Sequence, residues 1–179
     1  LNLRGNKIYG ALPETMFSLE SLESLNLVYN EMSGNIPSSI KRLKRLEYLN
    51  LGGNFFEGEV PPDISDLKNL SVLYLFKNSL TGSIPKQIGS MKSLQKLSLA
   101  DNRLTGSVPD ELGGLNMKKN FGSIDLSNNL LSGKVYGSMC RLVNNKISIT
   151  LSGNFICGPY PDCILESLGY QDTVDCLKN

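Results

Sequence analysis

An asparagine recurs along this chain of 179 residues at an almost constant interval. The interval is 24 residues four times, then 27 and 25, and the positions are Asn6, Asn30, Asn54, Asn78, Asn102, Asn129 and Asn154. A leucine lies three residues before each asparagine, and a glycine lies four residues after it. A fixed period of this length indicates stacked structural repeats, because each repeat contributes the same elements to a shared core.

The rest of each repeat is equally regular. Apolar residues lie two and ten positions after the asparagine, and proline lies seven positions after it except where Tyr136 stands. The Leu-x-Leu segment predicts a short strand with inward leucines, and the asparagine amide can donate to and accept from neighbouring backbone groups. Glycine and proline predict an extended segment, and a short helical turn, as at 38–43, would close each coil. The predicted fold class is an α/β repeat solenoid.

The consensus LxxLxxLxLxxNxLxGxIPxxIxxLxxL resembles the leucine-rich repeat of the plant extracellular type. Such repeats occur in ectodomains of receptor-like kinases and receptor-like proteins, and in secreted proteins similar to polygalacturonase inhibitors. The resemblance covers residues 1–164 and implies a right-handed solenoid with a concave parallel β-sheet, short helical turns on the convex side and a second row of extended segments. It also implies a binding protein rather than an enzyme, with a peptide, an oligosaccharide or another protein as partner.

The composition argues against several other classes of function. The 18 Lys and Arg residues balance 17 Asp and Glu residues at a net charge of +1, so no basic surface for nucleic acid is expected. The chain has no His, hence no Ser-His, Cys-His or HExxH site, and we expect neither a cofactor nor a metal. No apolar run is long enough to span a bilayer, so a membrane tether would lie outside this chain.

The two ends of the chain differ. The chain begins within the strand of a repeat, so the first of about seven coils is incomplete and a preceding cap is expected in a longer parent chain. The repeats, with coils of 24–27 residues, are predicted to span residues 1–164, and residues 165–179 are predicted to form a C-terminal cap. This organisation predicts the C-terminal part of a longer secreted or receptor protein.

All four cysteines lie near the C-terminus, at Cys140, Cys157, Cys163 and Cys176. Their spacings of 17, 6 and 13 do not fit a zinc site, so we expect two disulfides that staple the cap in an oxidising compartment. Cys140 and Cys163 follow their asparagines by 11 and 9 residues in consecutive coils, which favours the pairs Cys140–Cys163 and Cys157–Cys176. The alternative is Cys157–Cys163 with Cys140–Cys176.

A single Asn-x-Ser/Thr sequon begins at Asn69. It lies just before a predicted strand, on the outer flank of a coil, where a glycan would project into solvent. Together with the disulfides, the sequon predicts an extracellular protein that is glycosylated at Asn69.

Residues that interleave with the inward leucines face outward, in rows along the concave sheet that are about 4.8 Å apart from strand to strand. Aromatic and β-branched residues gather there over the second to fourth coils, where Gly52 and Gly53 are expected to leave a gap and Val28 is expected to be exposed. An exposed apolar patch with a charged rim is typical of an interaction site. The predicted ligand-binding residues are Tyr29, Tyr48, Val72, Tyr74, Phe76, Lys77, Lys96 and Asp101. The alternative is that these aromatic residues only stabilise the strands.

These features predict an extracellular recognition module that binds its partner through the concave face. A secreted inhibitor of a cell-wall-degrading enzyme is the alternative function. An outward row of Asn2, Asn26 and Asn50 suggests ice binding more remotely, but Tyr74 interrupts that row. The neighbouring carboxylates of Asp101 and Asp125 suggest a glycosidase only weakly, because an open sheet forms no cleft around them.

Overall fold

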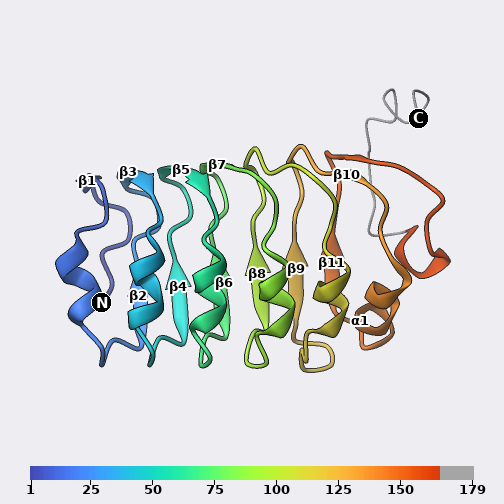
Figure 1. Ribbon diagram of the computed structural model, residues 1–179, viewed down its shortest axis with the longest axis horizontal. Helices are drawn as coiled ribbons and strands as arrows, with labels where there is room; N and C mark the ends of the chain where they lie inside the picture. The colour runs from blue at the N-terminus through green and yellow to red at the C-terminus, as the bar shows by residue number, and fades with distance from the viewer. Residues whose placement is uncertain (166–179) are drawn as a thin grey trace.

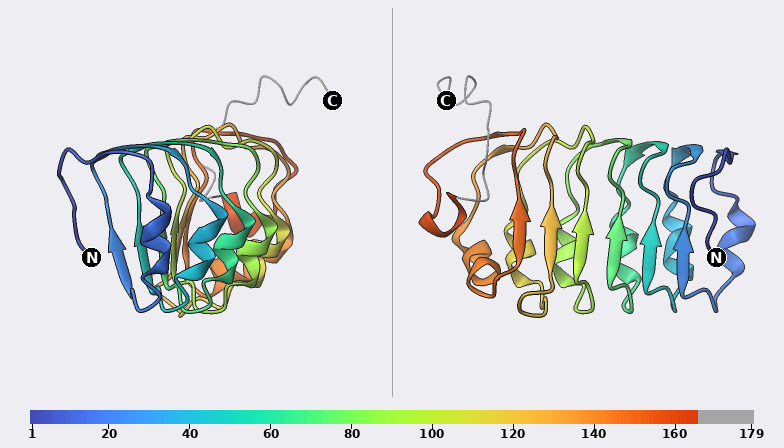
Figure 2. Two further views of the ribbon diagram at one scale, coloured as in Figure 1. Left: turned by 60° about the vertical axis from the view of Figure 1, so that its left-hand side comes forward. Right: turned by 180° about the vertical axis from the view of Figure 1, so that it is seen from behind.

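The computed structural model describes residues 1–165, and within them the predicted repeat solenoid is confirmed (Figure 1). The coils stack side by side along the long axis of the molecule. Strands cover one face, short helices cover the opposite face, and a second row of extended segments runs along the edge between them (Figures 1 and 2). The predicted C-terminal cap at 165–179 falls almost wholly outside the described residues.

The concave sheet has six parallel strands within residues 1–165, and their order in the sheet follows the chain. The strands are in register, so that Leu49 lies opposite Leu25 on one side and opposite Leu73 on the other. The strands are β2 (Ser24–Asn26), β4 (Tyr48–Asn50), β6 (Val72–Tyr74), β8 (Lys96–Ser98), β9 (Ser123–Asp125) and β11 (Ser148–Thr150). Because side chains alternate along a strand, each buried central residue sits between two outward residues.

The second row of extended segments, here called the lateral row, forms two smaller parallel sheets. The first contains β1 (Tyr9–Gly10), β3 (Glu31–Asn35), β5 (Phe55–Glu59) and β7 (Ser79–Thr81), and the second contains β10 (Ser132–Gly133) and β12 (Phe155–Ile156). Between them, a single bridge joins Ser83 to Thr105. Among the described coils, the fifth is therefore the one that contributes no strand to the lateral row.

The predicted helical turns are confirmed, and most of them are 3-10 helices. The residue just before each of the first five helices is the proline of the repeat, and its backbone is extended. Proline presets φ and has no N–H to donate to a preceding turn. The helices are η1 (Glu14–Ser18), η2 (Ser38–Arg42), η3 (Pro62–Asp66), η4 (Lys86–Ser90), η5 (Asp110–Gly114), η6 (Gly137–Met139), α1 (Cys140–Asn144) and η7 (Asp162–Ile164). None of the helices in the described part of the chain has the length and apolar character that a membrane span needs.

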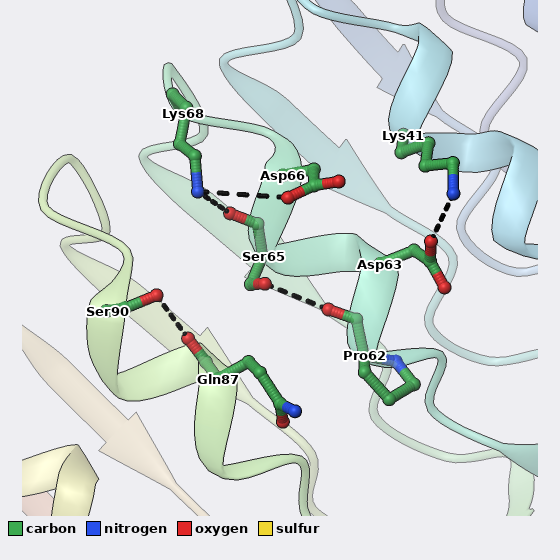
Figure 3. Close-up of polar contacts among 8 residues, drawn as sticks. All are labelled: Lys41, Pro62, Asp63, Ser65, Asp66, Lys68, Gln87 and Ser90. Atoms are coloured by element: carbon green, nitrogen blue, oxygen red, sulfur yellow. Dashed lines mark hydrogen bonds and ion pairs between the residues drawn. The ribbon is translucent and has the colours of Figure 1, made fainter.

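Polar contacts lie at the surface of the helical face, and one of them joins two neighbouring helices (Figure 3). The Lys41 ammonium in η2 is 2.6 Å from a carboxylate oxygen of Asp63 in η3. This hydrogen-bonded pair raises the pKa of Lys41 and lowers the pKa of Asp63. Both groups are accessible to solvent, so their contribution to stability is small.

The recurrent asparagines form a ladder of hydrogen bonds through the core. Asn54 Nδ2 donates to the carbonyls of Leu27 and Leu51, each at 3.0 Å, and Asn54 Oδ1 accepts from the Met32 N–H at 3.1 Å. The same arrangement recurs at Asn30, Asn78, Asn102, Asn129 and Asn154. The prediction that this amide both donates and accepts is confirmed. Each asparagine thereby links its own strand to the preceding coil.

One disulfide joins Cys140 in α1 to Cys163 in η7, with a Cα–Cα distance of 5.6 Å. This confirms the pair that stacking of consecutive coils favoured, and the alternative that paired Cys157 with Cys163 is wrong. The second predicted pair, Cys157–Cys176, depends on a residue outside the described part of the chain.

Candidate binding site on the concave face

Four aromatic side chains, Tyr29, Tyr48, Tyr74 and Phe76, form a continuous cluster on the concave face, here called the aromatic cluster. Tyr48 opens β4 and Tyr74 closes β6, while Tyr29 and Phe76 follow the strands of their coils. The ring centroids are 6.2–6.3 Å apart in edge-to-face contacts that join Tyr48 to Tyr74, Tyr74 to Phe76 and Phe76 to Tyr29. Such pairs are favourable beyond their buried area, so the rings support one another before any ligand binds.

The predicted gap at Gly52 and Gly53 is wrong, because two rings fill it. A Cβ added to Gly52 would lie 2.5 Å from Phe76 Cε1, and one added to Gly53 would lie 2.4 Å from Tyr29 Cδ1. The Phe76 and Tyr29 rings therefore occupy the space that side chains at these two positions would take. The glycines do not open a recess; they let the rings approach the sheet.

Exposure within the predicted patch is uneven. Tyr29 is 48% exposed, and Tyr48, Val72, Tyr74 and Phe76 are half-buried. Val28, by contrast, is only 4% exposed, so its predicted place in the exposed patch is wrong. A short side chain set among large neighbours has little surface left for solvent.

The outward asparagine row is not an open polar surface. Asn50 is buried beside the aromatic cluster, where its Nδ2 donates to the Tyr48 hydroxyl at 3.1 Å and its Oδ1 accepts from the Gly52 N–H at 3.0 Å. Asn50 therefore positions Tyr48 and the turn at Gly52. This removes one member of the row on which ice binding depended.

A left-handed backbone conformation recurs at the residue just before each ladder asparagine. The φ angle is 57° at Tyr29, 52° at Lys77 and 54° at Asp101, and the equivalent residues Gly5, Gly53, Asn128 and Gly153 share it. For a side chain other than Gly, Asn or Asp this conformation costs about 1–2 kcal/mol. Five of these seven positions hold Gly, Asn or Asp, and this preference is the signal in the sequence for a left-handed conformation. Tyr29 and Lys77 therefore depart from what the scaffold favours at two positions of the proposed site.

A hollow of about 330 Å³, here called the concave hollow, opens on the C-terminal side of the aromatic cluster. Tyr74 and Phe76 form part of its lining, and the remaining lining residues are Leu97, Ser98, Ser123, Ile124, Asp125, Ser148 and Thr150. Asp125 Oδ1 accepts hydrogen bonds from the Ser127 N–H at 3.1 Å and the Ser127 hydroxyl at 2.6 Å. The concave hollow thus combines an aromatic wall, several hydroxyl groups and one oriented carboxylate.

The sequence missed most residues of the concave hollow, because short hydroxyl residues carry no signal by themselves. Lys77, Lys96 and Asp101 were predicted as site residues, but none of them lines the hollow. Lys77 and Lys96 are exposed on the concave face, and Asp101 Oδ1 accepts from Asn128 Nδ2 at 2.8 Å. Asp101 and Asp125 are thus held by different partners, in adjoining coils of the open sheet.

Burial, with a smaller effect of the neighbouring Tyr48, raises the pKa of Tyr74. The Tyr74 phenol therefore stays protonated at neutral pH and can both donate and accept a hydrogen bond. It offers a ligand an apolar ring and a polar tip on the same side chain.

Asn69 lies exposed on the outer flank of its coil, just before β6, where its Nδ2 donates to the Lys44 carbonyl at 2.9 Å. The side chain is accessible from solvent. Glycosylation at this position stays a prediction.

The coil geometry, the asparagine ladder and the parallel sheets define a repeat protein of the leucine-rich class. The leucine-rich repeat family profile matches residues 1–56, and a second profile of the same description matches residues 69–91 and 93–115. A chain of the BIR3–SERK2 complex from Arabidopsis thaliana is 36% identical, with a TM-score of 0.59, over 78% of this chain and 73% of that chain. The chain belongs to the plant extracellular leucine-rich repeat family.

Two further solved structures have a similar fold. The Arabidopsis receptor kinase HAESA, solved with the peptide hormone IDA and the co-receptor SERK1, is 33% identical with a TM-score of 0.87. This likeness covers 96% of the present chain and 29% of the HAESA chain, so the present chain spans less than a third of that relative. A plant ice-binding protein has a TM-score of 0.64 at 22% identity over 97% of this chain and 76% of that chain, which is a likeness of fold alone. No protein of curated function matches the sequence.

Proposed function

We propose that this chain is an extracellular recognition module that binds an extended peptide across the aromatic cluster and the concave hollow. The observation that carries the proposal is the continuity of these two features, which share Tyr74 and Phe76. Aromatic residues with an exposed apolar face are favoured anchors of protein interfaces. The hydroxyl groups and Asp125 beside them supply polar partners for a peptide backbone or side chain.

The length of the site supports a peptide rather than a small sugar. Tyr29 belongs to the second coil and Thr150 to the seventh, so five strand spacings of about 4.8 Å separate them, or roughly 24 Å in all. An extended chain advances about 3.4 Å per residue, so about seven residues would span this distance. HAESA is a relative that was solved with a peptide hormone, and the present proposal extends that ligand class to this chain.

The extracellular location rests on separate observations. The Cys140–Cys163 disulfide is typical of an oxidising compartment, and the similar chain of HAESA belongs to a plant receptor kinase. We infer that the module acts outside the cell as a binding domain without catalytic activity.

The test uses a displayed library of random peptides, selected for binding to the purified chain. Selected peptides should lose at least tenfold in affinity, about 1.4 kcal/mol, when Tyr74→Ser and Phe76→Ser are combined. Gly52→Ala should weaken the same peptides, because its Cβ would displace the Phe76 ring. Tyr9→Ser is the matched control, since Tyr9 is 82% exposed on the lateral row and should not matter.

Circular dichroism establishes that each variant is folded. Unchanged affinity of the Tyr74 and Phe76 double variant for the selected peptides would refute the proposed site. Tight binding of oligogalacturonides with no peptide enriched would instead assign an oligosaccharide ligand, and inhibition of a polygalacturonase by the purified chain would support the inhibitor function.

A further inference from the structure

A second and larger hollow, here called the lateral hollow, lies where the extended segments enter η3, η4 and η5. Its volume is about 770 Å³, and it shares no lining residue with the concave hollow. The lateral hollow is therefore independent of the site proposed above. The lateral row and the helical face meet there, away from the concave sheet (Figures 1 and 2).

The order of side-chain sizes along the lateral row explains why this surface is recessed. The position five residues after the ladder asparagine holds Glu59 in the third coil, but only Ser83 and Ser107 in the fourth and fifth. In the sixth coil this position holds Lys134, which is exposed but does not line the hollow. Tyr136, two residues later, does line it; it stands where the other complete coils have proline, and its side chain is 49% exposed. Two short residues between a glutamate and a tyrosine leave a depression two coils wide.

The charge of the lateral hollow is negative, although the chain as a whole has a net charge of +1. Glu59, Asp110 and Glu111 line it, against Lys86 as the one basic lining residue. The Asp110 carboxylate accepts a hydrogen bond from the Ser138 hydroxyl. Within the described residues, no ion pair occupies Glu59 or Glu111.

We propose that the lateral hollow is a second binding site, which takes an extended, basic segment of a partner protein. Arginine or lysine side chains of that segment pair with Glu59 and Glu111, and one of them stacks on the Tyr136 ring, since cations are attracted to the face of an aromatic ring. Three coil spacings of about 4.8 Å separate Glu59 from Tyr136, or roughly 14 Å. Four or five extended residues span that distance. Basic residues at every second position all point to one side of an extended segment, about 7 Å apart, so three of them reach from Glu59 to Tyr136.

The probe is a synthetic heptapeptide, acetyl-Ala-Arg-Ala-Arg-Ala-Arg-Ala-amide, titrated into the folded chain at low ionic strength and followed by NMR. Perturbed amide signals should gather at Ser83, Ser107 and Tyr136. Binding should weaken as salt is added, because the contacts are ionic and exposed. The counterpart peptide with glutamate in place of arginine should not bind.

Two variants and two controls separate this site from the rest of the surface. Tyr136→Pro restores the proline of the other coils, and it should weaken the arginine peptide at least fivefold, as should Glu111→Gln. Glu31→Gln, an exposed change in β3 away from the hollow, should leave affinity unchanged. The combined Tyr74→Ser and Phe76→Ser changes should also leave it unchanged, so that failure here is distinct from failure of the concave site.

Equal affinity of Tyr136→Pro and the unchanged chain would overturn the proposal. Perturbed signals centred on Asp101 and Asp125 would also overturn it, since they would place the basic peptide on the concave face.

Discussion

Replacing Asn78 by alanine tests whether the asparagine ladder stabilises the solenoid. Asn78 Nδ2 donates to the carbonyls of Leu51 and Leu75 at 3.1 and 3.0 Å, and Asn78 Oδ1 accepts from the Phe56 N–H at 3.0 Å. The two carbonyls keep a second partner, because Asn54 also donates to Leu51 and Asn102 also donates to Leu75. The Phe56 N–H loses its acceptor.

The expected loss follows from that difference. An inaccessible N–H without a partner costs about 1–3 kcal/mol, and each bond lost from a carbonyl that keeps another partner costs about 0.5–1 kcal/mol. The sum is about 3 kcal/mol of unfolding free energy. Asn26→Ala is the matched control, because Asn26 Oδ1 accepts one bond, from the Val28 N–H at 3.2 Å, on the concave surface. That control should lose under about 1 kcal/mol.

The assay is urea unfolding followed by far-UV circular dichroism. A further variant, Asn78→Asp, keeps the acceptor for Phe56 but turns a carboxylate oxygen toward two carbonyl oxygens, so it should lose at least as much as alanine. Equal losses for Asn78→Ala and Asn26→Ala would refute the reasoning, since inward and outward asparagines would then be energetically alike.

Two further predictions concern the phenol of Tyr74 and the disulfide. Because the pKa of Tyr74 is raised, the stability that this group contributes is present below the usual tyrosine pKa of about 10 and is lost as pH rises through the higher folded value. A spectrophotometric titration of the chain against Tyr74→Phe should show one phenol ionising late, and an ordinary transition for that phenol would contradict its burial. Combining Cys140→Ser with Cys163→Ser opens a loop with a sequence separation of 23, which should lower the unfolding free energy by about 3 kcal/mol. An unchanged urea midpoint would show that the loop is held closed by other contacts.

Much of the fold could be predicted from the period alone. Leu25, Leu49 and Leu73 are fully buried, as the Leu-x-Leu pattern predicts, and the Cys140–Cys163 pair followed from counting positions within coils. These features repeat because every coil must fit the one before it. The inward positions therefore recur in every repeat and can be recognised by comparing the repeats with one another.

The site was predicted less completely. Tyr74 stands out because its row is otherwise polar, and Phe76 stands out as the one aromatic residue of its row. The structure joins both to Tyr29 and Tyr48 in one cluster. The serines of the concave hollow gave no such signal, since a short residue marks a recess only when its neighbours are large. These serines line a hollow only because the rings of Tyr74 and Phe76 form a wall beside them.

The sequence by itself determined the coil, the inward leucines, the asparagine ladder and the residues that face outward. Only the tertiary structure decided that the rings of Phe76 and Tyr29 fill the space at Gly52 and Gly53 and that Val28 is buried. It also decided that two serines line the lateral hollow beside Tyr136. Backbone periodicity decides which face a side chain leaves from. The direction it then takes depends on the space left by residues 24 or more positions away, and that space exists only once the coils have stacked.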